Sequence, residues 1–124
     1  MSEAKKRVLC LEDDPDTCEL VEIILAADGF EVIAANTLAD AMQLIGADCF
    51  ALYIVDQHLP GGAGLDFIHR VRHGGDSTPI LVHSAAAYKR DIDAALEAGA
   101  DEYLVKPNGW TKLTETVNAL LGTG

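Results

Sequence analysis

Basic residues are scarce in this chain of 124 residues: nine lysines and arginines stand against 20 aspartates and glutamates, which gives a formal net charge of −11. A protein that binds nucleic acid needs a basic face for the phosphates, and this imbalance produces a field that repels them. The composition therefore argues against direct nucleic-acid binding. We expect any effect on DNA to need a partner.

Long hydrophobic runs are missing as well. No apolar stretch approaches the ~20 residues of a membrane span, and no signal-peptide hydrophobic segment follows the polar start at 2–7. Only three cysteines occur, Cys10, Cys18 and Cys49, and none has the C-x-x-C spacing of a redox or metal site. They predict reduced thiols in the core. We therefore expect a cytoplasmic protein without membrane contact.

Hydrophobic residues nevertheless make up 49% of the chain. Most of the short apolar runs do not alternate with polar residues, which is typical of strands buried on both faces of a parallel sheet. The segments between them are long enough for a helix and two loops. We expect a single domain over 1–124, with its core over about residues 7–122. The five predicted strands are 8–11, 31–35, 51–55, 79–83 and 102–105.

The helices between these runs have recognisable starts. Asp14 before Pro15 is typical of the residue that caps a helix and the proline that opens it. Thr37, with Asp40 three residues later, resembles a capping box for a second helix, which we expect to end before Gly46.

A glycine-rich segment, 61–64, predicts a flexible loop before the third helix. Right-handed crossovers place helices on both faces of the sheet. The sequence thus predicts an α/β fold, a three-layer α/β/α sandwich of the flavodoxin type around a five-stranded parallel sheet of order 2-1-3-4-5. We expect the last three helices at about 65–72, 87–98 and 110–121.

Residues that carry chemistry directly follow the predicted strands: Glu12 and Asp13 after the first, Asp56 after the third, Ser84 after the fourth and Lys106 after the fifth. In the order 2-1-3-4-5 the first and third strands are neighbours, so their carboxylates converge at one crevice. Crowded carboxylates either hold a proton or bind a hard cation. Mg²⁺ (or Mn²⁺) is a cation that suits such oxygen ligands. A lysine beside them can form an ion pair with a phosphoryl group.

Simpler explanations cover part of this pattern. The helix dipole favours acidic residues near a helix start, which explains Asp14 but not Asp56, because no helix start follows Asp56. Ser84 on its own fits a cap or a turn. Lys106 on its own does not indicate a function.

Two histidine patterns also have simple explanations. His69 and His73 have the i, i+4 spacing of a metal clamp, but Arg70 stands where a zinc protease helix needs glutamate. We expect an exposed helix end there. His83 precedes Ser84, and strand alternation sends the two side chains to opposite faces, which argues against a catalytic pair.

In their order along the chain, these motifs resemble the receiver domain of two-component response regulators, the CheY-like superfamily. The resemblance implies Mg²⁺-dependent transfer of a phosphoryl group from a phosphohistidine to Asp56, and no enzymatic turnover beyond the gain and loss of that group. It implies a sensor histidine kinase or a histidine phosphotransfer protein as donor, and a downstream protein target or a separate effector domain. The motifs are Glu12-Asp13, Asp56, Leu59-Pro60-Gly61, Gly64, Ser84-Ala85, Gly99-Ala100-Asp101-Glu102-Tyr103 and Lys106-Pro107.

The resemblance also implies the metal ligands and the acceptor. Asp56 is the expected phosphoacceptor, and Glu12 and Asp13 match the acidic pair that holds Mg²⁺ together with Asp56. The backbone carbonyl of His58 is expected to complete the protein ligands.

The remaining site residues are expected to respond to the phosphoryl group. Ser84 and Tyr103 match the hydroxyl and the aromatic ring of the switch, and Lys106 matches the cation that pairs with the phosphoryl group. The resemblance implies a cis peptide bond between Lys106 and Pro107. It places the docking face of the histidine-containing partner on the first helix and the loop after the fifth strand, with Asp16, Thr17, Leu20 and Pro107.

The sequence departs from the family pattern at Asn108-Gly109, with Trp110 after them, and at Ala63 and His58. The first departure bears on the output face, and His58 lies where a side chain can tune the lifetime of the phosphoryl group.

Three alternatives stay open. One is a Mg²⁺-dependent aspartyl-phosphate phosphatase with Asp56 as nucleophile, although haloacid-dehalogenase-like phosphatases have a second aspartate at the position of His58. Another is a degenerate receiver that acts without phosphorylation. The last is a flavodoxin-like binding module, in which the acidic residues 12–14 would repel a flavin phosphate.

Overall fold

A computed structural model describes residues 5–107 and 110–122. Its strands form a parallel sheet of order β2-β1-β3-β4-β5, which confirms the predicted topology. A short 3-10 turn, η1 (Pro60–Gly62), precedes the third helix. The other elements are β1 (Lys6–Leu11), α1 (Pro15–Ala27), β2 (Phe30–Ala35), α2 (Leu38–Ala47), β3 (Leu52–Val55), α3 (Ala63–His73), β4 (Ile80–Ser84), α4 (Lys89–Ala98), β5 (Glu102–Val105) and α5 (Trp110–Leu121).

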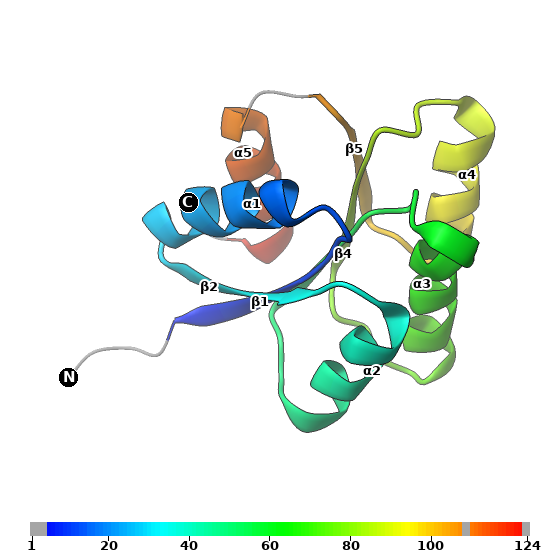
Figure 1. Ribbon diagram of the computed structural model, residues 1–124, viewed down its shortest axis with the longest axis horizontal. Helices are drawn as coiled ribbons and strands as arrows, with labels where there is room; N and C mark the ends of the chain where they lie inside the picture. Colours follow the sequence, from blue (N-terminus) through cyan, green and yellow to red (C-terminus); the bar gives the residue numbers. More distant parts are fainter. Residues whose placement is uncertain (1–4, 108–109, 123–124) are drawn as a thin grey trace.

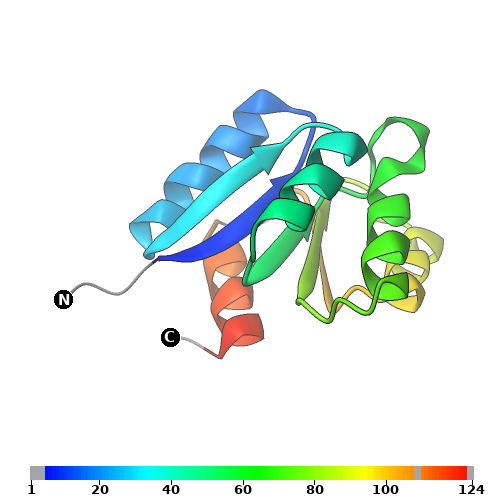
Figure 2. The ribbon, with the colours of Figure 1, turned by 90° about the horizontal axis from the view of Figure 1, so that it is seen from below.

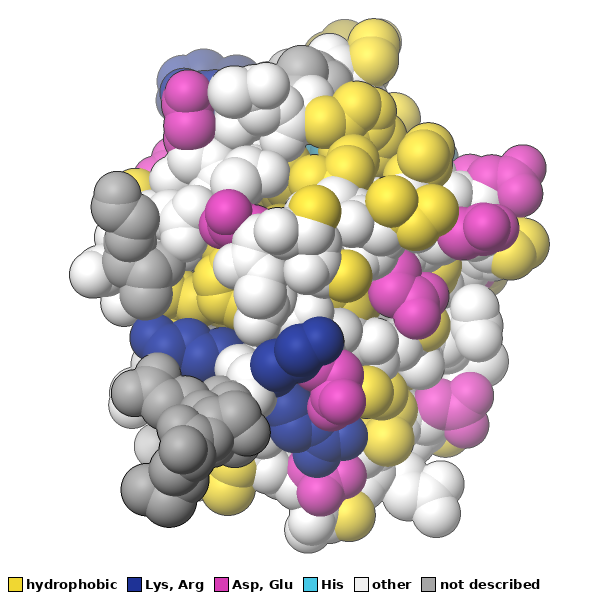
Figure 3. All heavy atoms as spheres, turned by 90° about the vertical axis from the view of Figure 1, so that its left-hand side faces the viewer, with side chains coloured by type: hydrophobic (Ala, Val, Ile, Leu, Met, Phe, Trp, Pro, Cys, Tyr) yellow, Lys and Arg dark blue, Asp and Glu magenta, His cyan; other side chains and the backbone are white. Residues whose placement is uncertain are grey.

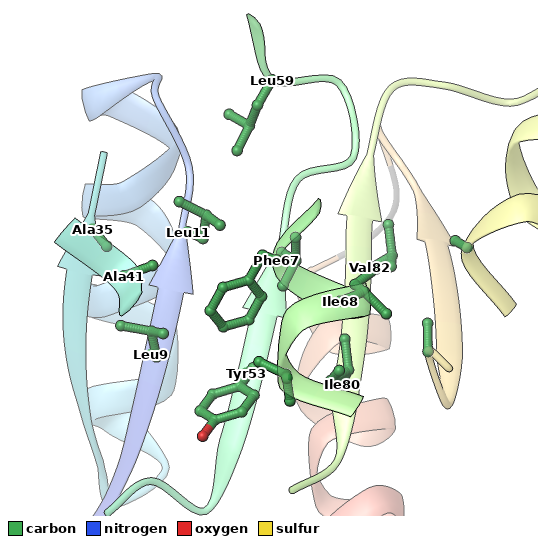
Figure 4. Packing of buried hydrophobic residues seen from close by; sticks show 14 of the residues in the cluster. Leu9, Leu11, Ala35, Ala41, Tyr53, Leu59, Phe67, Ile68, Ile80 and Val82 are labelled. Atoms are coloured by element: carbon green, nitrogen blue, oxygen red, sulfur yellow. The ribbon is translucent and has the colours of Figure 1, made fainter. Parts of the chain in front are cut away.

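Helices cover both faces of the sheet, as predicted. Figures 1 and 2 show α1 and α5 on one side and α2, α3 and α4 on the other. Within β1, Leu9 and Leu11 pack into the core under α2 and α3, where Phe67 stands at the centre (Figure 4). Val8 and Cys10 point to the opposite core, under α1 and α5. Because both faces are buried, the strand reads as a continuous apolar run.

The predicted helix starts at Asp14 and Thr37 are confirmed. The Asp14 carboxylate accepts hydrogen bonds from the backbone N–H of Asp16 (3.3 Å) and the hydroxyl of Thr17 (2.6 Å). The Thr37 hydroxyl accepts from the N–H of Asp40 (3.1 Å). These contacts satisfy N–H groups that the first helical turn leaves without a partner.

Several predicted boundaries were wrong by one or two residues. Helix α2 runs through Gly46 to Ala47, because one glycine costs a helix only about 1 kcal/mol and its apolar neighbours pack against the core. Helix α4 starts at Lys89, two residues later than predicted.

The third correction concerns Gly64, which lies inside α3 and not in a flexible loop. A Cβ at this position would stand 2.4 Å from the carbonyl oxygen of Asp56 and 2.8 Å from the Cα of Gln57. Glycine is therefore needed for close packing of α3 on the residues after β3. The freedom of the glycine-rich segment is used one turn earlier, where Gly61 and Gly62 have φ of 69° and 73°.

The prediction of three core thiols holds for two of them. Cys10 and Cys18 are buried between β1 and α1, whereas Cys49 is exposed because it lies in the connection from α2 to β3. Over the described residues, no helix is long and apolar enough to cross a membrane.

A polar cluster, here called the Arg72 network, lies at the amino-terminal ends of β4 and β5. Nε of Arg72 donates to the carbonyl of Gly99 (3.0 Å), and Nη1 donates to the carbonyls of Asp76 (2.7 Å) and Thr78 (2.8 Å). Nη2 donates to the carboxylate of Asp101 (3.0 Å). The guanidinium thereby joins the end of α3 to the starts of β4 and β5.

Candidate functional site

Backbone hydrogen bonds continue the sheet one residue past its strands and fix the first polar residues there. The N–H of Glu12 donates to the carbonyl of Ala35 (3.0 Å), and the N–H of Asp56 donates to the carbonyl of Leu11 (2.9 Å). The N–H of Lys106 donates to the carbonyl of Ser84 (2.8 Å). The carboxyl edge of the sheet therefore holds these side chains together, as the sequence predicted from strand order.

Three acidic residues form one cluster at this edge. Glu12, Asp13 and Asp56 each offer a carboxylate oxygen, and these oxygens lie within 4.8 Å of one another. Glu12 and Asp56 are buried, at 3% and 8% exposure, whereas Asp13 is exposed. Carboxylate oxygens at this spacing, with one open side, are the donor set of a hard divalent cation.

Lys106 is the cation of the cluster. Its ammonium group hydrogen-bonds to Oε1 of Glu12 and lies 3.6 Å from Oδ2 of Asp56. Burial acts to lower the pKa of Lys106, but the two carboxylates outweigh it and raise the pKa above its usual value. The lysine stays charged and offsets part of the negative charge.

The two buried carboxyl groups differ in protonation. Burial, and then the hydrogen bond with Asp56, raise the pKa of Glu12 to about 7 against the opposing effect of Lys106. Burial acts in the same direction on Asp56, but hydrogen bonds from Glu12 and from the N–H of His58 (2.9 Å) and the charge of Lys106 lower its pKa. Asp56 is therefore ionised at neutral pH, whereas Glu12 gains and loses its proton near neutral pH.

The switch residues expected from the sequence lie next to this cluster. Ser84 is fully buried, and its hydroxyl accepts from the N–H of Ala86 (3.2 Å). The hydroxyl of Tyr103 donates to the carbonyl of Ala86 (2.6 Å). Both side chains are thus tied to the segment that leads into α4.

The loop after β5 contains a cis peptide bond between Lys106 and Pro107. The departure at Asn108-Gly109 lies outside the described residues. Trp110 opens α5, and its ring meets that of His83 edge-on at 5.9 Å.

The four histidines of the chain lie in different surroundings. His83 points toward α5, and burial lowers its pKa to about 4, so it is a neutral core residue. His69 and His73 are exposed on α3, and within 5–107 and 110–122 the only cluster with metal-ligand geometry is the acidic one. The side chain of His58 is exposed at the rim of the site.

Sequence reasoning missed some residues that support the site. The amide of Asn36 donates to the carbonyl of Glu12 (3.2 Å), and the thiol of Cys18 donates to the same oxygen (3.4 Å). Gln57 lines a hollow beside Asp13 and has a buried, unpartnered oxygen. No spacing rule points to these side chains, and only nearness to Asp56 singles out Gln57.

Comparison with curated proteins gives relatives that are named as response regulators or transcriptional regulatory proteins. The chain is 36% identical to the transcriptional regulatory protein BasR of Escherichia coli over 117 residues, which are 93% of this chain and 52% of that protein. It is 30% identical to the response regulator protein PilR of Pseudomonas aeruginosa over 118 residues, 95% of this chain and 26% of that protein. The chain thus spans about half or less of these relatives.

Solved structures of similar length have the same fold. A putative response regulator from Chloroflexus aurantiacus superposes with a TM-score of 0.89 at 31% identity, covering 96% of this chain and 99% of that one. The chemotaxis protein CheY4 of Vibrio cholerae gives 0.88 at 27% identity, with 95% and 100% covered. The family model of the response regulator receiver domain matches residues 8–118. This chain therefore belongs to the receiver domains of two-component response regulators.

Proposed function

We propose that this receiver domain accepts a phosphoryl group on Asp56 from a phosphohistidine. One observation carries the proposal: Asp56 is a buried carboxylate with a lowered pKa, while the pKa of its neighbour Glu12 is raised to about 7. An ionised carboxylate is a competent nucleophile, provided that the charge of the incoming group is offset. Lys106 supplies part of that offset.

The acidic cluster fits a magnesium ion on its donor chemistry. Glu12, Asp13 and Asp56, with the backbone carbonyl of His58, would hold the ion. When bound, Mg²⁺ supplies positive charge to the transferring oxygens. The exposed position of Asp13 leaves an open side for the donor.

The chemical step uses this chain's own groups. One oxygen of Asp56 attacks phosphorus, and the bond from phosphorus to the imidazole nitrogen breaks. The nitrogen keeps the electron pair, and because the other ring nitrogen of the donor carries a proton, the products are a neutral imidazole and an aspartyl phosphate. Lys106 then pairs with a phosphoryl oxygen, in keeping with its position 3.6 Å from Asp56.

The proposal includes a switch at Ser84 and Tyr103. The new phosphoryl oxygens are strong acceptors and draw the hydroxyl of Ser84 away from the N–H of Ala86. Since Tyr103 is bonded to the same residue, the segment before α4 repacks and changes the surface of α4, β5 and α5. Unchanged amide shifts on this surface after addition of a phosphoryl mimic would contradict the switch.

The donor partner is proposed to dock on α1 and the loop after β5. Leu20 and Ile23 on α1 are 44% and 59% exposed. Figure 3 shows hydrophobic side chains next to acidic ones on one face of the molecule. We propose a sensor histidine kinase or a histidine phosphotransfer protein as the donor.

The signal is proposed to pass by protein contact, to a downstream target or a separate effector domain, since the charge of −11 disfavours direct contact with nucleic acid. The proposal keeps the cytoplasmic location and the single domain expected from the sequence. It includes no turnover beyond the domain's own aspartyl phosphate.

Incubation with acetyl phosphate, with and without Mg²⁺, tests the proposal. Intact mass is expected to rise by one phosphoryl group in the wild type with Mg²⁺ and not in Asp56→Asn. Asp66→Asn, an exposed aspartate in α3, is the matched control and should react like the wild type. No gain in the wild type would favour a degenerate receiver, and turnover of small phosphoesters by the wild type would favour the phosphatase.

A further inference from the structure

The amide oxygen of Gln57 has no hydrogen-bond partner. Within the described part of the chain, this Oε1 is the buried side-chain polar atom for which no partner is found. A buried acceptor left in this state destabilises the fold, because its lost hydration is not replaced by a hydrogen bond. Such a group in a folded protein calls for a donor that the chain itself does not supply.

The position of Gln57 indicates where that donor comes from. The side chain lines a hollow of about 330 Å³ together with Asp13 and the segment 58–60. Asp13 is also a member of the acidic cluster, and Gln57 directly follows Asp56. The residue that carries the unpartnered oxygen therefore lines the same hollow as a member of the acidic cluster.

The backbone of Gln57 is held firmly in this place. Gly64 of α3 packs so closely that a Cβ would stand 2.8 Å from the Cα of Gln57. The N–H of the next residue, His58, is bonded to the carboxylate of Asp56 (2.9 Å). Only the side chain of Gln57 is free to adjust, and its terminal amide torsion is broad.

We propose that Gln57 is a positioning residue that accepts a hydrogen bond from a water molecule bound to Mg²⁺. Mg²⁺ keeps several waters when carboxylates bind it, and its waters need acceptors in the hollow that Gln57 lines. The amide oxygen accepts such a bond without adding charge. This inference rests on the magnesium site of the proposed function and adds to it an uncharged residue outside the direct ligands.

The test is Mg²⁺ affinity, measured by isothermal titration calorimetry on the unphosphorylated protein. Gln57→Met keeps the length of the side chain and removes the acceptor. We expect it to weaken Mg²⁺ binding about tenfold, the size of effect known for outer-shell partners of metal ligands. Gln43→Met, an exposed glutamine on α2, is the matched control and should bind like the wild type.

Thermal unfolding in EDTA separates this role from a structural one. Removal of an unpartnered acceptor leaves the midpoint of thermal unfolding of the metal-free protein unchanged, or raises it. A lower midpoint of Gln57→Met in EDTA would overturn the inference, because it would show that the amide has a partner within the chain. Equal Mg²⁺ affinity of Gln57→Met and the wild type would also overturn it, while leaving the proposed function intact. If the wild type bound no Mg²⁺, the magnesium site itself would fail.

Discussion

The two ends of the strands, which form the amino and carboxyl edges of the sheet, carry polar clusters of opposite character. In the Arg72 network, four hydrogen bonds of one guanidinium reach three carbonyls and a carboxylate. At the carboxyl edge, three carboxylates stand around the single ammonium of Lys106. The first cluster is complete without a ligand. The second leaves excess negative charge that a cation and a phosphoryl group can use, so completeness distinguishes a structural cluster from a functional one.

The largest effect on stability is expected from a variant that breaks the Arg72 network. Arg72→Met leaves the carbonyls of Gly99, Asp76 and Thr78 without their donor, and we expect the free energy of unfolding in urea to fall by about 4 kcal/mol. Arg70→Met, on the exposed side of the same helix, is the control and should change it by less than about 0.5 kcal/mol. Equal effects of the two variants would contradict a structural role for the network.

The next effect concerns pH and the buried ring of His83. Its pKa is lowered from 6.5 to about 4, so the unfolded chain binds more protons between these values and stability falls as pH drops through this window. The loss by pH 4 is expected to reach about 3 kcal/mol.

His83→Leu should flatten this pH dependence in urea unfolding between pH 6.5 and 4. His69→Leu, at an exposed position of α3, should keep the slope of the wild type. Parallel pH profiles for His83→Leu and the wild type would show that another group is responsible.

The smallest effect is the sharpest comparison, because one substitution is made at both edges. In EDTA, Asp56→Asn removes the charge that helps to raise the pKa of Glu12 to about 7, and we expect stability at neutral pH to rise by about 1 kcal/mol. Asp76→Asn weakens an acceptor of the Tyr53 hydroxyl (2.5 Å) and of Thr78 (2.6 Å), and we expect a fall of about 1 kcal/mol. Urea unfolding measures both. The same sign for both variants would contradict the difference between the edges.

Sequence reasoning located the carboxyl edge because strand order determines it. Glu12, Asp56 and Lys106 are each the first residue after a strand, and a parallel sheet brings such residues to one edge. The strands themselves were recognisable because burial on both faces removes polar alternation.

The same reasoning did not find the Arg72 network or the role of Gly64. Arg72 and Asp101 are 29 positions apart and follow no motif. The need for glycine at 64 depends on how closely α3 approaches Asp56, which only the packed structure shows. The exposure of Cys49 likewise follows from its place in a connection and not from its apolar neighbours.

The identity of the phosphorylated residue tests the central claim most directly. After reaction with acetyl phosphate and Mg²⁺, borohydride reduction converts an aspartyl phosphate into homoserine, and peptide mass spectrometry locates it. Homoserine at position 56 is the expected result. Homoserine at position 13, or phosphate on Ser84 with position 56 unchanged, would contradict the assignment of Asp56 as the acceptor.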